Sequence, residues 1–275
     1  MNFISLLALA VAPGVAIALY IYLKDQHERE PLSLLLISFL YGMLSAVITL
    51  IISFPLNIFL ITKPHDVVGE FYNAFFKVAL VEEMSKFLFV RFVLYNNKNF
   101  NEPFDGIVYA VMVSMGFATL ENILYVYEFG ITTGILRMFT AVPAHAVFGV
   151  LMGYFVGKAR FAPYRQFYYS VIGLGAAAIL HGAYDYFWFL SHLPALWIGG
   201  VASLVLGFVL ARKAIRLHQQ ASPFLMKKEN RGISFVSGAS LSPVLCEAKD
   251  DRAGTCDYDC RQSSDCRGPS VLAIR

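Results

Sequence analysis

The chain is poor in charge. Only 15% of its 275 residues are Asp, Glu, Lys or Arg, whereas 57% are hydrophobic. A soluble domain carries about 25% charged residues, and the mean hydropathy of +0.60 is correspondingly high. These values exclude an ordinary soluble protein and indicate a polytopic membrane protein. The net charge of +3 is small and gives no indication of nucleic-acid binding.

Cysteine is missing from the first 245 residues, and the four cysteines lie near the end, at Cys246, Cys256, Cys260 and Cys266. Their spacing fits no zinc-ribbon or zinc-finger pattern. The chain also has no Gly-rich phosphate loop, no His-Glu-x-x-His motif and no Ser/His/Asp set. Residues 1–22 lack basic residues ahead of their hydrophobic core. They therefore predict a retained first transmembrane helix and not a cleaved signal peptide.

Seven apolar segments are long enough to be membrane-spanning helices. They cover residues 2–23, 32–62, 71–95, 104–127, 134–157, 168–190 and 193–211. Basic residues gather in alternate loops, thirteen on one side against two on the other. The positive-inside rule then places the N-terminus outside and the C-terminus in the cytoplasm. We predict an all-helical transmembrane bundle of about seven spans, residues 1–212, followed by a cytoplasmic, disordered tail, residues 213–275, with reduced cysteines.

Ionisable side chains stand inside several of these segments, where an unpaired charge costs at least about 2.5–3.5 kcal/mol. Four of the predicted helices contribute them: Glu82, Glu83 and Lys86, then Glu121, then His145, then His181 and Asp185. With a rise of about 1.5 Å per residue, the three glutamates, the two histidines and Asp185 lie between the middle of the membrane and its outer surface. We therefore predict that they meet in one layer.

The residues around His145 indicate which way it faces. Gly149, Gly153 and Gly157 follow it at steps of four, and such a stripe lets another helix approach closely. His145 is therefore expected to point into the bundle. Other charged residues are expected to be solvated at the outer edge: Asp66, Glu70, Glu128 and Arg137.

The chemistry of this layer has two open interpretations. One carboxylate could act as general base on a water while another group donates a proton. Alternatively, His and Glu side chains could bind a zinc-like metal that activates the water. Each residue alone has a simpler interpretation, such as a neutralised Glu82–Lys86 pair. The shared depth favours one functional site, with hydrolysis ranked ahead of proton-coupled transport.

Several motifs resemble those of the PrsW intramembrane proteases. The resemblance rests on Glu82-Glu83-x-x-Lys86, on Glu121-Asn122 at the end of residues 116–122, on Pro143-x-His145-Ala146 and on His181-Gly182-x-x-Asp185; it extends to Ala12-Pro13-Gly14, Asp25-Gln26, Glu30-Pro31 and residues 105–109. The resemblance to the PrsW proteases covers about residues 1–216. The chain is also similar, more distantly, to the CAAX prenyl endopeptidases and to bacteriocin-processing or immunity proteins.

The resemblance implies an endopeptidase of the bacterial plasma membrane that makes the first cut in a single-pass anti-sigma factor, on its outer side. By this resemblance, the active-site positions of the PrsW proteases match Glu82, Glu83, Glu121, His145 and His181. We expect Lys86, Asn122 and Asp185 to support them. If a divalent metal such as zinc is used, the expected ligands are Glu83, Glu121, His145 and His181. A transporter, or an immunity or scaffolding protein, is the alternative.

Overall fold

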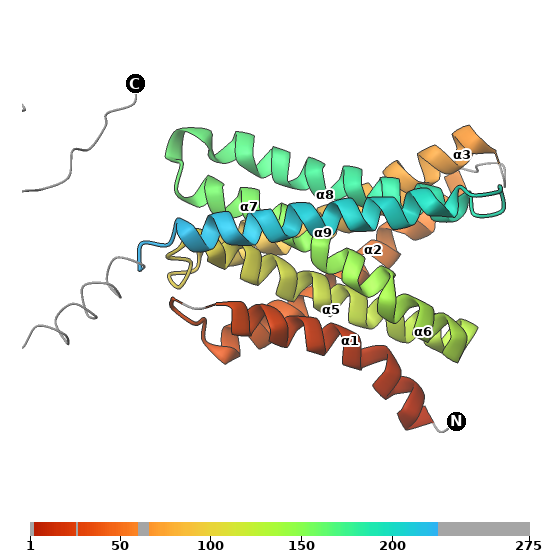
Figure 1. Cartoon of the computed structure of the whole chain (residues 1–275), viewed down its shortest axis with the longest axis horizontal. Helices are drawn as coiled ribbons and strands as arrows, with labels where there is room; N and C mark the ends of the chain where they lie inside the picture. Colours follow the sequence, from red (N-terminus) through yellow and green to blue (C-terminus); the bar gives the residue numbers. More distant parts are fainter. Residues whose placement is uncertain (1–2, 26, 60–65, 225–275) are drawn as a thin grey trace, which may run out of the picture. The chain divides into compact units, whose positions relative to one another are not determined.

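The computed structural model describes residues 3–25, 27–59 and 66–224, and every regular element in these ranges is a helix (Figure 1). The predicted all-helical fold is therefore confirmed. The long helices are α1 (Phe3–Lys24), α2 (Leu32–Phe59), α5 (Pro103–Phe129), α7 (Ala141–Arg160), α8 (Gln166–Phe189) and α9 (Trp197–Gln220). A short helix, α6 (Ile131–Phe139), stands between α5 and α7, and a short 3-10 turn, η4 (Pro163–Arg165), precedes α8.

Six helices in the described part of the chain are long and apolar enough to cross a membrane. They are Ile4–Lys24, Leu32–Ile58, Pro103–Phe129, Ile131–Arg160, Pro163–Phe189 and Trp197–Gln220. The sequence predicted a seventh span over residues 71–95. That stretch is helical but carries five charged residues, and it is not among the six.

Other sequence-based expectations stay predictions. These are the number of crossings, the orientation of the termini and the domain boundary at residue 212. Most of the predicted tail, with its four cysteines, lies outside the described residues.

The stretch with Glu82 and Glu83 alternates between helix types. It runs through α3 (Val67–Tyr72), a π-helix η1 (Asn73–Ala79), α4 (Leu80–Leu88), a second π-helix η2 (Phe89–Val93) and a 3-10 turn η3 (Leu94–Asn96). Short π-helical insertions occur mostly as local distortions, frequently at functional sites. The two here flank α4, whose charged side chains Glu82, Glu83 and Lys86 are all buried. This path therefore turns its charged face inward.

Helix α5 is packed between α2 and α7 by close backbone approaches. A Cβ atom on Gly153 would clash with the Gly106 carbonyl, and one on Gly157 with the Pro103 carbonyl. On the other side of α5, a Cβ atom on Gly116 would clash with the carbonyl of Phe39 in α2. The glycine stripe after His145 thus packs against α5, as predicted, and it holds His145 at the level of Glu121.

Candidate active site

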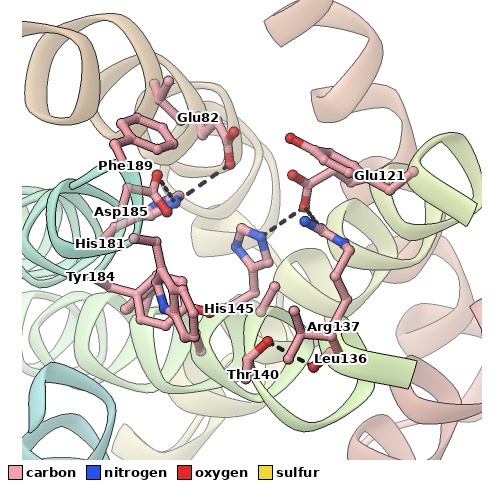
Figure 2. A pocket seen from close by; sticks show the side chains of 16 residues that line it. Glu82, Glu121, Leu136, Arg137, Thr140, His145, His181, Tyr184, Asp185 and Phe189 are labelled. Atoms are coloured by element: carbon pink, nitrogen blue, oxygen red, sulfur yellow. Dashed lines mark hydrogen bonds and ion pairs between the residues drawn. The ribbon is translucent and has the colours of Figure 1, made fainter. Parts of the chain in front are cut away.

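Eight ionisable side chains from α4, α5, α6, α7 and α8 form one connected network, which we call the polar cluster. Figure 2 labels those of its members that line a cavity: Glu82, Glu121, Arg137, His145, His181 and Asp185. Its members are Glu82, Glu83, Lys86, Glu121, Arg137, His145, His181 and Asp185. The six carboxylates and histidines expected in one layer are all included, and so is Lys86. The eighth, Arg137, was expected elsewhere.

The Lys86 ammonium lies at the centre of the polar cluster. Its Nζ is 2.8 Å from Glu83 Oε1, 3.5 Å from Glu82 Oε2 and 3.2 Å from His145 Nδ1. It also stands 3.8 Å from the centroid of the Phe117 ring. Lys86 is only 1% exposed. A buried ammonium is tolerated when its anionic partners are in contact with it, and both adjacent glutamates serve here.

The contacts of His145 fix its tautomer. An ammonium has no acceptor, so His145 Nδ1 must face Lys86 with its lone pair. The proton of the neutral ring is then on Nε2, which donates to Glu121 Oε2 at 2.9 Å. Glu121 therefore orients His145 from the far side of the ring. This is the arrangement by which a carboxylate orients a metal-binding histidine.

Arg137 was predicted to be solvated, and this prediction is wrong. Its side chain is 13% exposed, and one guanidinium nitrogen, Nη2, lies 2.7 Å from Glu121 Oε2. Its Nε donates to Asn122 Oδ1 at 3.1 Å, and Asn122 in turn donates to the Ala10 carbonyl of α1. The chain turns at Gly130, where a φ of 81° ends α5 in a conformation that suits glycine. The separate helix α6 then returns Arg137 to the cluster.

His181 contacts two carboxylates through its two ring nitrogens. Nδ1 is 2.9 Å from Glu83 Oε1, and Nε2 is 3.2 Å from Asp185 Oδ2. Glu82 Oε2 is 3.9 Å from the same Nε2. The ring satisfies both close contacts as an imidazolium, or by donating from Nε2 and directing the Nδ1 lone pair at a metal. The predicted pairing of His181 with Asp185 is present in the structure.

A cavity of about 230 Å³ opens beside the polar cluster. Its polar wall includes Glu82, Glu121, Arg137, His145, His181 and Asp185, and its apolar wall includes Phe148 and Trp188. Glu83 does not line the cavity and is fully buried. Adjacent helical residues point about 100° apart, and here Glu82 is the one that faces the cavity. Figure 2 shows Glu82 and Glu121 on opposite sides of His145.

The arrangement fits a metal ion. Among the described residues, one group of His, Cys, Asp and Glu brings its ligand atoms within 4.8 Å of one another, and its members are Glu82, Glu83, His145 and His181. The predicted set had Glu121 in place of Glu82. The buried Glu83 Oε2 has no hydrogen-bond partner among the described residues, so it is free to bind an ion. Two imidazoles with carboxylates form a typical zinc-binding donor set.

A second group of buried carboxylates lies where the ends of α1, α5 and α9 meet. We call Asp25, Glu30, Glu102 and Asp105 the carboxyl cluster; they are 0%, 5%, 1% and 0% exposed. Asp105 Oδ2 accepts from the backbone N–H groups of Asn101 and Glu102, and Glu102 Oε2 accepts from the Ser222 hydroxyl. No Lys or Arg in the described ranges forms an ion pair with these four.

Because the carboxyl cluster lacks cations in contact, burial acts on its carboxyl groups directly. Burial, with the nearby charge of Glu102 as the next contribution, raises the pKa of Asp25 to about 7. Burial also raises the pKa values of Glu30 and Glu102. The sequence showed Asp25, Glu30 and Asp105 only as parts of motifs that resemble a family, and it gave no sign that they meet.

Comparison with known proteins gives a consistent result. A sequence model described as PrsW family intramembrane metalloprotease matches residues 30–212. Protease PrsW of Geobacillus kaustophilus is 43% identical over 184 residues, which cover 66% of this chain and 79% of that protein. Protease PrsW of Bacillus subtilis is 36% identical over 185 residues, covering 66% and 82%. That of Halalkalibacterium halodurans is 32% identical over 213 residues, covering 76% and 95%. No solved structure matches.

Proposed function

The chain belongs to the PrsW family of intramembrane metalloproteases, and we propose that the polar cluster is its active site. The observation that carries the proposal is the wall of the 230 Å³ cavity, where a carboxylate and two oriented histidines face one space. Such a constellation suits water-activated peptide hydrolysis. Its three side chains, Glu82, His145 and His181, come from α4, α7 and α8, so packing between these helices sets their relative positions.

Glu82 is the proposed general base. It is the glutamate of the adjacent pair that reaches the cavity, where a water and a peptide bond can approach it. It takes a proton from the water as the water attacks the peptide carbonyl, and it returns that proton to the leaving amine. Lys86, 3.5 Å from Glu82 Oε2, favours the ionised carboxylate that this role requires.

Glu83, His145 and His181 are the proposed metal ligands, with Glu82 close enough to contribute. A bound metal such as zinc supplies a Lewis acid for the carbonyl oxygen and makes a bound water nucleophilic at neutral pH. Glu121 and Arg137 hold His145 in the tautomer whose Nδ1 lone pair faces Lys86. Asp185 holds His181 in the same way through Nε2. Both histidines thus have a carboxylate behind them.

The proposed substrate is a single-pass membrane anti-sigma factor, cut on its outer side. The resemblance to the PrsW proteases supports this choice of substrate. The predicted depth of the ionisable residues, between mid-membrane and the outer surface, agrees with a cut on that side. A bacterial plasma membrane is the corresponding location.

The test is shedding of a tagged single-pass anti-sigma factor from cells that produce the protein. Glu82→Gln keeps the shape of the side chain but removes the base, so we expect cleavage to fall about 10²–10⁴-fold, while the protein accumulates normally in the membrane. Glu128→Gln, a matched change at an exposed position near the end of α5, should cleave normally. Undiminished cleavage by Glu82→Gln would contradict the assignment. A proton-coupled transporter would show pH-gradient-dependent flux and no cleavage.

A further inference from the structure

Lys86 stands where a metal ion would contact its ligands. The ammonium is 2.8 Å from Glu83 Oε1 and 3.2 Å from His145 Nδ1, and both residues belong to the four whose ligand atoms converge within 4.8 Å. Glu83 Oε1 is in turn 2.9 Å from His181 Nδ1. A positively charged group thus already occupies the donor atoms that a metal needs.

Lys86 and a metal ion would compete for the same nitrogen of His145, because an unprotonated imidazole nitrogen has only one lone pair. A carboxylate oxygen can accept from an ammonium and bind a metal at the same time, because it has more than one lone pair. His145 Nδ1 has one, since its Nε2 carries the proton given to Glu121. Nδ1 can accept from Lys86 or bind a metal, but it cannot do both.

We propose that Lys86 is an internal substitute for the metal ion, which holds the ligands in place in the metal-free enzyme and must leave His145 Nδ1 before the metal can bind. The inference rests on the metal centre of the proposed function. Without a cation, Glu82 and Glu83 would face each other's charge in a buried site, where such charges are costly. The ammonium removes that repulsion, so the metal-free protein can fold with its ligands already placed.

The structure also offers Lys86 a place to go. Its Nζ is already 3.5 Å from Glu82 Oε2, and Glu82 lines the cavity. A turn of the long, flexible side chain toward Glu82 would keep a carboxylate partner while freeing Nδ1 of His145. The consequence is competition: the affinity of the site for a metal is lowered by the need to displace the ammonium.

The test measures metal affinity and not activity. Purified protein is stripped with a chelator and titrated with Co²⁺, whose visible absorption reports direct coordination, in competition with a chromophoric chelator. Lys86→Met removes the competing charge, so we expect Co²⁺ to bind at least 10-fold more tightly than in the unaltered protein. The same variant, when metal-free, should unfold at a lower temperature, and saturating Co²⁺ should restore much of the difference.

Two further variants test whether the effect belongs to the charge at position 86. Lys77→Met removes another buried lysine of the same helical path, outside the polar cluster, and should leave the Co²⁺ affinity unchanged. Lys86→Arg keeps the charge, so this variant should bind Co²⁺ no more tightly than the unaltered protein. Because it retains a cation for folding, it can still be measured if Lys86→Met does not accumulate.

Each outcome decides the matter. Unchanged or weaker Co²⁺ binding in Lys86→Met, or tighter binding in Lys86→Arg, would overturn the inference while leaving the metal centre intact. If neither the unaltered protein nor Lys86→Met binds Co²⁺, and cleavage survives the chelator, the metal centre itself is refuted together with the inference. The Glu82 base would then still be tested by the shedding assay.

Discussion

The protein buries two groups of carboxylates, and they differ in whether cationic side chains contact them. In the polar cluster, every carboxylate contacts a lysine, an arginine or a histidine at 3.2 Å or less, except Glu82, whose distance to Lys86 is 3.5 Å. In the carboxyl cluster, none of the four forms an ion pair within the described ranges, and Asp105 and Glu102 accept hydrogen bonds from backbone amides and a serine hydroxyl. The contacts of the polar cluster stabilise ionised carboxylates, whereas the surroundings of the carboxyl cluster disfavour them.

The difference shows what a buried carboxylate needs in order to act as a base or a ligand. It must stay ionised, and in low dielectric this requires cations in contact. Lys86 and Arg137 provide them for the polar cluster, which also opens on a cavity. The described carboxyl cluster has neither cations in contact nor a place among the residues of that cavity, and its hydrogen bonds join the start of α5 to Ser222 just beyond α9. The exposed fractions of the side chains alone would not distinguish the polar cluster from the carboxyl cluster.

The largest expected effect is a difference in sign between the two clusters. In metal-free protein, Glu83→Gln leaves Lys86 and His181 facing a neutral amide, and loss of one partner of a buried pair costs about 3–5 kcal/mol of folding stability. Asp25→Asn removes a carboxyl group that resists ionisation, so at pH 8 it should raise the stability by up to about 4 kcal/mol, because each unit between the ordinary pKa and the raised one is worth about 1.4 kcal/mol. Thermal unfolding in detergent measures both. Changes of the same sign would contradict the distinction between the clusters.

A smaller effect is expected at Arg137, which contacts the polar cluster from α6. Arg137→Met removes the cation beside Glu121 and so weakens the hold of Glu121 on His145. We expect kcat/KM for a peptide substrate to fall about 10–100-fold, the range typical of groups that orient metal ligands. Arg137→Lys keeps the charge and should recover part of the activity. Full activity in Arg137→Met would show that Glu121 orients His145 without help.

The last expected effect is a pH dependence of stability from Asp25. Its pKa is about 7 in the folded protein against 3.8 ordinarily, so the folded state binds more protons between these values. Stability should therefore fall as pH rises from about 4 to 7 and level off above 7. Asp25→Asn should flatten this part of the profile, and the two curves should converge toward pH 4. Parallel curves from pH 4 to 8 would contradict the raised pKa.

Much of the polar cluster was predictable because helices have a fixed rise. Depth along a helix follows from residue number, so Glu82, Glu121, His145 and His181 could be assigned to one layer from sequence alone. The glycine stripe after His145 also predicted correctly that this face packs against a neighbouring helix. These inferences needed only local geometry and the cost of charge in a membrane.

The position of Arg137 could not be predicted from helical rise and residue number. Residues 134–157 read as one continuous apolar helix, but the structure ends α6 at Phe139 and begins α7 at Ala141. The break, together with the turn at Gly130, changes the direction of α6 and brings Arg137 to Glu121. Gly130 was the available signal, because glycine commonly ends a helix. The sequence did not indicate the direction in which the chain would continue.

By itself, the sequence determined the membrane class, the helical fold and the shared depth of the ionisable side chains, because hydrophobicity and helical rise are properties of the chain. Only the tertiary structure decided that Glu82 faces the cavity while Glu83 is enclosed, that Lys86 contacts both, and which nitrogen of each histidine faces inward. These depend on how each helix is rotated about its axis. Packing between helices sets that rotation, through contacts such as those of Gly106 with Gly153 and of Gly116 with Phe39.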